Sequence, residues 1–335
     1  GLVALLVATT LLTLKARQAE PERTADAAPS GSLLELSPKA IGIWLFLSAA
    51  GSTMMVSYTN HIIHNIAPVP LLWVVPLGLY LLTFILCFGG GRAYRPEVFI
   101  FLTQLLLMIT GLWRSYSWSD ILLNLAALFA ACMVFHGELY ARRPHPARLP
   151  WFYLAVALGG AIGGVLVNVI APQVFTDYTE FHWIGLIAAG YTLYLAWDRY
   201  RLFNGRAANG AWAGLFTLAM LLYAKNVFLT PYYGADSRVL AEARNFYGTA
   251  KVTDTATRRV MYNGTILHGL QEKDPKTGQL LMKPPSYFAT NSAVGVADRL
   301  TRGRHPGHLR HIGVIGLGVG TIALYGQAGD AVTFF

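Results

Sequence analysis

The chain has 335 residues, of which 54% are apolar and only 13% are charged, against a share of about 25% charged residues in typical soluble domains. This composition, with a mean hydropathy of +0.44, excludes an ordinary soluble globular protein and favours a membrane protein. The net charge of +9 then indicates cytoplasmic loops and anionic ligands or lipid headgroups rather than nucleic acid. Both cysteines, Cys87 and Cys132, lie in apolar runs, which excludes a disulfide framework.

The density of charge divides the chain into two parts. Residues 1–224 hold 13 Lys/Arg and 10 Asp/Glu, whereas residues 225–335 hold 13 and 7 in about half the length. We therefore predict a multi-pass transmembrane domain over 1–224, followed by a soluble α/β domain over 225–335. Because the chain begins and ends inside apolar runs, we interpret it as a fragment of a longer protein.

The first part contains a series of apolar segments, most of which approach the ~20 residues that a transmembrane helix needs. They lie at about 1–14, 40–58, 69–88, 98–113, 120–137, 151–172, 181–197 and 211–229. The glycines of Gly159-Gly160-Ala-Ile-Gly163-Gly164 predict a small-residue face that lets two helices pack closely. Aromatic residues at segment ends, such as Trp118 and Trp151, are typical of interfacial belts.

Loop charge predicts the orientation of these segments. The loops alternate between basic and nearly uncharged, and the loop at 15–39, with its four Lys/Arg residues, is expected in the cytoplasm. If 211–229 also spans, the soluble part lies outside. Only the 14 positions of 211–224 are apolar without interruption before Lys225, so we predict a re-entrant or interfacial segment there and a cytoplasmic soluble domain.

Polar residues inside the apolar segments are candidates for function. His61 and His64 are three residues apart, a spacing that can bring two imidazoles to one metal, but no third ligand is near in sequence. A polar patch at a helix end is the stronger interpretation, and we predict no metal site. His136 and Glu138 adjoin a basic loop, which favours a structural anchor as much as a functional role.

The soluble part begins with patterns typical of β-strands. We predict strands at 246–253, 259–262 and 265–271, with a tight turn at Asn263-Gly264 and a loop at 274–278. These elements form a small β-region over about 244–288. A helix follows at 291–302, capped by Asn291 or Ser292.

The most specific chemical signal is a glycine-rich turn between a strand and a helix. A strand at 309–315 leads into Gly316-Leu-Gly318-Val-Gly320-Thr321 and a helical stretch at 322–325, which predicts the start of a Rossmann-like sheet over about 289–335. A dinucleotide fingerprint requires glycine at 321, where Thr321 stands. The spacing fits better the loop that holds the methionine-derived part of S-adenosylmethionine-type cofactors, and a glycine-rich turn without a ligand is the alternative.

Several motifs together resemble the spermidine synthase (polyamine aminopropyltransferase) family, and in particular its membrane-embedded, fused branch. In the soluble part they are Arg244-Asn-Phe-Tyr-Gly248, Asn263-Gly264, His268-Gly269 with Gln271, Pro285-Ser-Tyr287 and the run 314–323. In the apolar part they are the run 67–84, His136-Gly-Glu138 and the run 151–172. The resemblance covers nearly the whole chain.

This resemblance implies transfer of an aminopropyl group from decarboxylated S-adenosylmethionine, as co-substrate, to an amine such as putrescine, without a metal. By the same resemblance Gly316, Gly318, Gly320 and Gln271 bind the cofactor, and Tyr287 lines the active site. The resemblance also implies a location in the cell (inner) membrane. We expect the lipid bilayer as a partner and no nucleic acid, and a homo-oligomer is left open.

The sequence also departs from the family pattern. Val319 stands where soluble members have an Asp in the glycine loop, and Phe288 and Ala289 replace the His and Glu that follow the tyrosine. The catalytic Asp of the family lies beyond Phe335, so the fragment alone is expected to be inactive. Two alternatives remain open: a methyltransferase-like enzyme that uses S-adenosylmethionine, and a transporter whose soluble domain senses a ligand.

Overall fold

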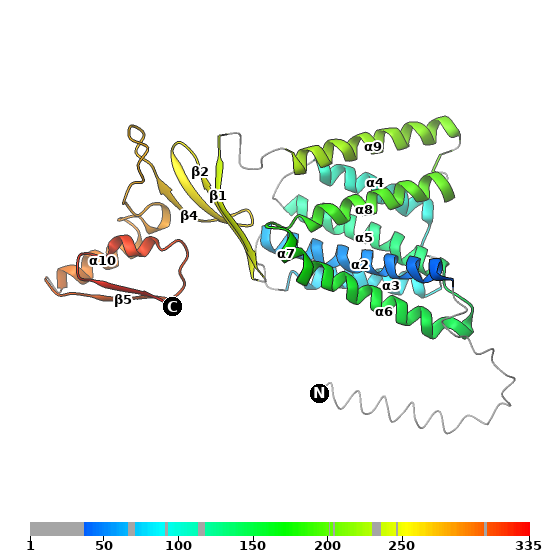
Figure 1. Cartoon of the computed structure of the whole chain (residues 1–335), viewed down its shortest axis with the longest axis horizontal. Helices are drawn as coiled ribbons and strands as arrows, with labels where there is room; N and C mark the ends of the chain where they lie inside the picture. The colour runs from blue at the N-terminus through cyan, green and yellow to red at the C-terminus, as the bar shows by residue number, and fades with distance from the viewer. Residues whose placement is uncertain are drawn as a thin grey trace, which may run out of the picture.

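The structure is a computed structural model that describes residues 37–65, 71–90, 93–112, 118–200, 202–203, 205–229, 236–245, 247–304 and 307–335. A bundle of long helices is followed by a smaller part built from strands, which lies at one end of the bundle (Figure 1). The predicted change from apolar helices to strands is confirmed, although the boundary expected at 224/225 falls inside the last helix of the bundle, which ends at Phe228. The predicted segment 1–14 falls outside the described residues.

The helices of the bundle lie side by side and alternate in direction (Figure 1). They are α2 (Pro38–Asn65), α3 (Val74–Phe88), α4 (Pro96–Leu112), α5 (Trp118–Ala141), α6 (Leu149–Val165), α7 (Ala171–Val174), α8 (Glu180–Tyr194) and α9 (Arg206–Phe228). A π-helical turn, Leu166–Ile170, joins α6 to α7, and another, Leu195–Arg199, follows α8. Among the described residues, four helical stretches are long and apolar enough to cross a membrane: Pro38–His64, Trp118–Ala141, Pro146–Val174 and Arg206–Phe228. The helices α3 and α4 are shorter, with 15 and 17 residues.

Helix α9 differs from the re-entrant or interfacial segment expected at 211–229. It is one unbroken helix of 23 residues, which begins at Arg206 and continues through Lys225. Its aromatic side chains contact the bundle: Trp212 Nε1 donates a hydrogen bond to Gln104 Oε1 at 2.7 Å, and Tyr223 Oη lies 2.6 Å from His182 Nδ1. The re-entrant interpretation is wrong because Lys225 lies in the last turn of a continuous helix and does not interrupt it.

Helices α2 and α6 pack closely through glycine and serine. A Cβ on Gly159 would lie 2.7 Å from the carbonyl oxygen of Leu45, and a Cβ on Gly163 would lie 2.6 Å from that of Ala49. Ser48 Oγ donates to the carbonyl of Val156 at 2.6 Å, and Ser52 Oγ to that of Gly160 at 2.9 Å. The predicted small-residue face is therefore confirmed for the glycines at 159 and 163, whereas a Cβ on Gly164 would meet nothing within 4 Å.

The soluble part contains two sheets. Strands β1 (Arg238–Asn245), β2 (Gly248–Asp254), β3 (Arg258–Asn263) and β4 (Ile266–Glu272) form an antiparallel sheet in that order. After the short turn η5 (Ser286–Phe288) and helix α10 (Ala293–Arg304), strand β5 (His311–Val314) pairs in parallel with β6 (Ala331–Phe334), with the 3₁₀ turn η6 (Thr321–Tyr325) between them. The cap of α10 is Ser292, whose Oγ accepts the Gly295 N–H at 3.4 Å.

Two boundaries of the soluble part differ from the prediction. Strand β1 begins at Arg238, so the β-region starts before the expected 244, and the predicted strand at 246–253 corresponds to β2. The sequence of β1 is rich in Ala, Glu, Leu and Arg, which favour helices, and pairing with β2 overrides that preference. The helical stretch after the glycines is a five-residue 3₁₀ turn rather than an α-helix, so the Rossmann-like identity remains a prediction.

Candidate functional site

The loop after β5 requires its glycines for backbone reasons. Gly316, Gly318 and Gly320 have φ angles of 87°, 53° and 70°, a region that residues with a side chain rarely adopt. The loop is closed by two backbone hydrogen bonds of 2.9 Å, from Gly316 N–H to the carbonyl of Phe335 and from Gly320 N–H to that of Leu317. A Cβ on Gly316 or Gly318 would meet nothing within 4 Å, so this side of the glycine loop (Gly316–Gly320) is open to a ligand.

The other side of the glycine loop packs on strand β4. A Cβ placed on Gly269 would lie only 2.2 Å from Val319 Cγ2, so the valine fills the space that a side chain at 269 would need. This contact assigns a role to two residues of the sequence motifs. Position 269 requires glycine because the side chain of Val319 lies too close to leave room for another side chain. Val319, at the position where the resembling family has an acid, makes an apolar contact with β4.

Tyr287 lies beside the same strand. Its hydroxyl donates a hydrogen bond to the carbonyl of His268 at 3.0 Å, and its side chain is exposed. The turn that holds it includes Ser286, whose φ of 59° is uncommon for a residue with a side chain. Tyr325 in η6 donates to the carbonyl of Phe288 at 2.6 Å, so this turn bridges β4 and the segment after the glycine loop.

Gln271 is hydrogen-bonded to the segment that follows β4. Its Nε2 donates to the carbonyl of Leu281 at 3.3 Å. Since alternate residues of a strand share a face, Gln271 lies on the face of β4 that carries Gly269. The structure thus gathers the glycine loop, Gly269 and Tyr287 in one region, with Gln271 farther along the same strand face.

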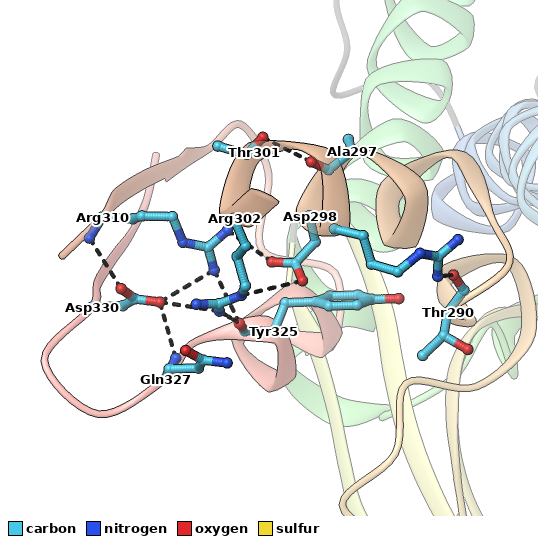
Figure 2. A network of polar contacts seen from close by, with 10 residues as sticks. Thr290, Ala297, Asp298, Thr301, Arg302, Arg310, Tyr325, Gln327 and Asp330 are labelled. Carbon is cyan, nitrogen blue, oxygen red and sulfur yellow. Dashed lines mark hydrogen bonds and ion pairs between the residues drawn. The ribbon is translucent and has the colours of Figure 1, made fainter. Parts of the chain in front are cut away.

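A network of ion pairs joins two aspartates and two arginines of the elements next to the glycine loop in sequence (Figure 2). The Asp330 carboxylate accepts the backbone N–H groups of Gln327 and Arg310, each at 3.0 Å, and lies 3.2 Å from the guanidinium groups of both Arg302 and Arg310. Asp298 in α10 pairs with the same two arginines, at 3.4 and 2.8 Å. Backbone hydrogen bonds from Gln327 and Arg310, and the guanidinium of Arg310, hold the pKa of Asp330 well below its usual range.

This network joins α10, β5 and the turn before β6, and it fixes the frame from which the glycine loop projects. The sequence reasoning missed it, although the Asp298–Arg302 spacing of four residues was a visible signal of a helix-surface pair. Because both carboxylates are paired with arginine, neither is available to hold the amino group of a ligand.

The polar residues of the bundle act as anchors. His61 stacks on Phe181 with ring centroids 3.9 Å apart, and His64 stacks on Tyr178 at 4.8 Å. Within the described residues, no group of three or more His, Cys, Asp or Glu side chains is arranged to hold a metal ion. The two stacking contacts place both histidines against aromatic rings of the 178–181 segment, as expected for a polar patch at a helix end.

His136 and Glu138 are both fully buried. His136 Nδ1 lies 2.8 Å from Thr83 Oγ1, and this hydroxyl also lies 2.7 Å from the carbonyl oxygen of Tyr80. Glu138 accepts a hydrogen bond from the Tyr94 hydroxyl at 3.0 Å and pairs with two arginines, Arg142 and Arg199. Glu138 thereby ties α5 to the α3–α4 connection and to the end of α8.

A second buried ion pair connects the two parts of the chain. Both terminal nitrogens of Arg244 in β1 donate to the carboxylate of Glu180 at the start of α8, at 2.7 and 2.8 Å. Arg244 also donates to the carbonyl of Asp177 at 2.6 Å, and the Arg244 and Glu180 side chains are only 3% and 8% exposed. Arg244, singled out as part of a sequence motif, is therefore a structural contact with the bundle.

The candidate site therefore consists of the glycine loop, which is open on one side and flanked by apolar residues, and of the neighbouring network of ion pairs. Ile315 and Leu317, which flank Gly316, expose 96% and 62% of their surface. Such apolar groups beside an open backbone suit a ligand with a flat base or an alkyl chain. Comparison of the chain with models of protein families, with curated proteins and with solved structures finds no match.

Proposed function

We propose that the soluble part binds an adenosyl-sulfur nucleotide at the glycine loop, and that the protein is a membrane-bound aminopropyltransferase of the spermidine synthase type. One observation carries the proposal: three alternating glycines with positive φ follow a strand that is paired in parallel, and the space beside Gly316 and Gly318 is open. In parallel sheets, ligands bind beyond the carboxyl ends of the strands, where this loop lies.

The chemistry needs little from the protein beyond orientation. A neutral amine attacks the carbon next to the sulfonium, the carbon–sulfur bond breaks, and a thioether leaves with the electron pair while the amine loses a proton to a base. In this chain the glycine loop would hold the methionine-derived part, and Tyr287, fixed through its hydroxyl to β4, would line the site.

A second candidate is favoured by apolar residues at three positions where the resembling family has an Asp, a His and a Glu. Val319, Phe288 and Ala289 cannot pair with the terminal amine of decarboxylated S-adenosylmethionine, and the nearby Asp298 is already bound to arginines. S-adenosylmethionine itself carries a carboxylate that backbone N–H groups can bind. The alternative is therefore a methyltransferase-like enzyme that uses S-adenosylmethionine.

Calorimetry on the detergent-solubilised full chain separates these functions. Binding of decarboxylated S-adenosylmethionine in preference to S-adenosylmethionine supports the first candidate, and the reverse preference supports the second. Gly318→Val should abolish binding, because the new side chain occupies the open side and disfavours the positive φ. Gly303→Ala, in α10 with nothing within 4 Å of its Cβ, is the matched control. Binding of NAD alone would refute both candidates.

The proposed function places the soluble part in the cytoplasm, where adenosyl-sulfur nucleotides are made. The distribution of basic residues between the two ends of the bundle argues for the opposite side of the membrane. The basic residues of the connections lie at the end of the bundle opposite the sheet, which by the positive-inside rule is the cytoplasmic end (Figure 1). They are Lys39, Arg95, Arg142, Arg143, Arg148, Arg199 and Arg206.

The side on which Thr277 lies therefore tests the function itself. Thr277 occupies an exposed loop, and a cysteine placed there is the sole thiol once Cys87 and Cys132 are replaced. We expect no labelling by a membrane-impermeant reagent in intact cells, and labelling after permeabilisation. Labelling in intact cells would place the soluble part outside and would refute the use of a cytoplasmic nucleotide.

A further inference from the structure

The junction between the bundle and the four-stranded sheet is a buried, directional contact rather than a flexible tether. Arg244 reaches Glu180 through two parallel hydrogen bonds, and its guanidinium also lies 4.6 Å from the ring centre of Tyr178. Lys251, on the neighbouring strand β2, lies 3.5 Å from the Asp177 carboxylate. Two strands of the soluble part thus hold one short segment, 177–180, at the start of α8.

Helix α2 contacts the same segment from the membrane side. His64 stacks on Tyr178, and His61 stacks on Phe181, the residue after Glu180. The segment is therefore enclosed between the last turns of α2 and the first two strands of the sheet. A displacement of α2 relative to α8 would disturb the geometry that the two hydrogen bonds of Arg244 require.

The sheet continues this contact to the glycine loop. Backbone hydrogen bonds connect β1 to β2, β2 to β3 and β3 to β4, and Gly269 of β4 meets Val319 of the glycine loop. Each of these connections is a ladder of backbone hydrogen bonds or a close packing contact. Because such contacts deform little, a displacement of β1 should displace β4 and the glycine loop as well.

We propose that the Arg244–Glu180 pair is a conformational latch, by which the membrane helices set the position of the sheet and thereby the conformation of the glycine loop. A buried ion pair suits a two-state contact, because an intact pair satisfies both charges whereas a broken pair must hydrate them. That a nucleotide senses this latch rests on the proposed function; the effect on the loop itself does not.

The test is amide hydrogen exchange of the full chain in lipid nanodiscs without ligand. Glu180→Gln keeps the shape of the side chain but removes its charge, and it should raise exchange at least threefold both in 238–254 and in the glycine loop. The exchanged pair, Glu180→Arg with Arg244→Glu, should restore protection at both places. Arg238→Gln, in the same strand but exposed, is the control and should change neither.

The outcomes separate the latch from the proposed function. Faster exchange in 238–254 with an unchanged glycine loop would overturn the latch, as would unchanged exchange in both regions. Nucleotide affinity is then measured by calorimetry on the same proteins, and we expect Glu180→Gln to weaken it about tenfold. If the unaltered chain binds no nucleotide, the proposed function fails while the exchange result still decides the latch.

Discussion

Replacing Gly269 by alanine tests whether strand β4 supports the glycine loop. The new Cβ would lie 2.2 Å from Val319 Cγ2 and 2.7 Å from Cγ1, far inside normal contact distances. Overpacking of this kind costs about 1–3 kcal/mol, and alanine in a strand regains about 0.5–1 kcal/mol over glycine. We expect a net loss of about 0.5–2 kcal/mol, which is an increase of about 2- to 30-fold in the opening-limited exchange of β4 amides.

The assay is residue-resolved hydrogen exchange of β4 and the glycine loop in the full chain. Adding Val319→Ala to Gly269→Ala removes both γ carbons and should restore most of the protection, because only Val319 Cβ, 3.0 Å away, remains close. Gly303→Ala, which introduces a Cβ into open space, controls for a general effect of losing a glycine. Equal or slower exchange in Gly269→Ala, or the same exchange with and without Val319→Ala, would refute the packing contact between β4 and the loop.

Three further predictions follow from other contacts. Gly163→Ala should weaken the association of α2 with α6, because its Cβ would meet the Ala49 carbonyl at 2.6 Å, whereas Gly164→Ala should not; thermal inactivation in detergent compares them. Since Asp330 has a lowered pKa in the folded protein, its stabilisation of β5 and β6 is complete above the ordinary carboxyl pKa of about 4 and is lost as the pH falls through the lower folded value. Exchange of these strands, corrected for intrinsic rates, should therefore lose protection in acid, and Asp330→Asn should remove most of that dependence. Ser286→Gly should increase protection of the 286–288 turn by relieving a φ of 59°; decreased protection would contradict the strain.

The parts of the fold that depend on local pattern were predictable from the sequence. Apolar runs of sufficient length gave the helices of the bundle, and the Asn263-Gly264 turn, where Gly264 has a φ of 58°, gave the β3–β4 connection. Strand β1 was missed because its residues favour a helix in isolation and become a strand only through pairing. The extent of α9 was missed because a polar residue near a helix end interrupts an apolar count without ending the helix.

The candidate site was predictable only where one short segment contains it. The three glycines of the loop lie within five residues, and the structure gives each a positive φ, which glycine adopts at no steric cost. Arg244 and Glu180 are 64 residues apart, and Gly269 and Val319 lie on separate elements, so no local pattern could pair them. Such contacts depend on how the sheet sits on the bundle, which a single sequence does not specify.

The contact between α2 and α6 has a consequence for how the protein is made. Ser48 and its partner Val156 are separated by 108 residues, so at a synthesis rate of about 5–20 residues per second the ribosome needs about 5–20 s to deliver α6 after α2. During that interval the serine-lined surface of α2 faces lipid or an insertion factor. Until α6 is synthesised, quality-control factors can therefore act on the incomplete bundle. Substitutions at this surface would lower protein yield before they change the finished fold.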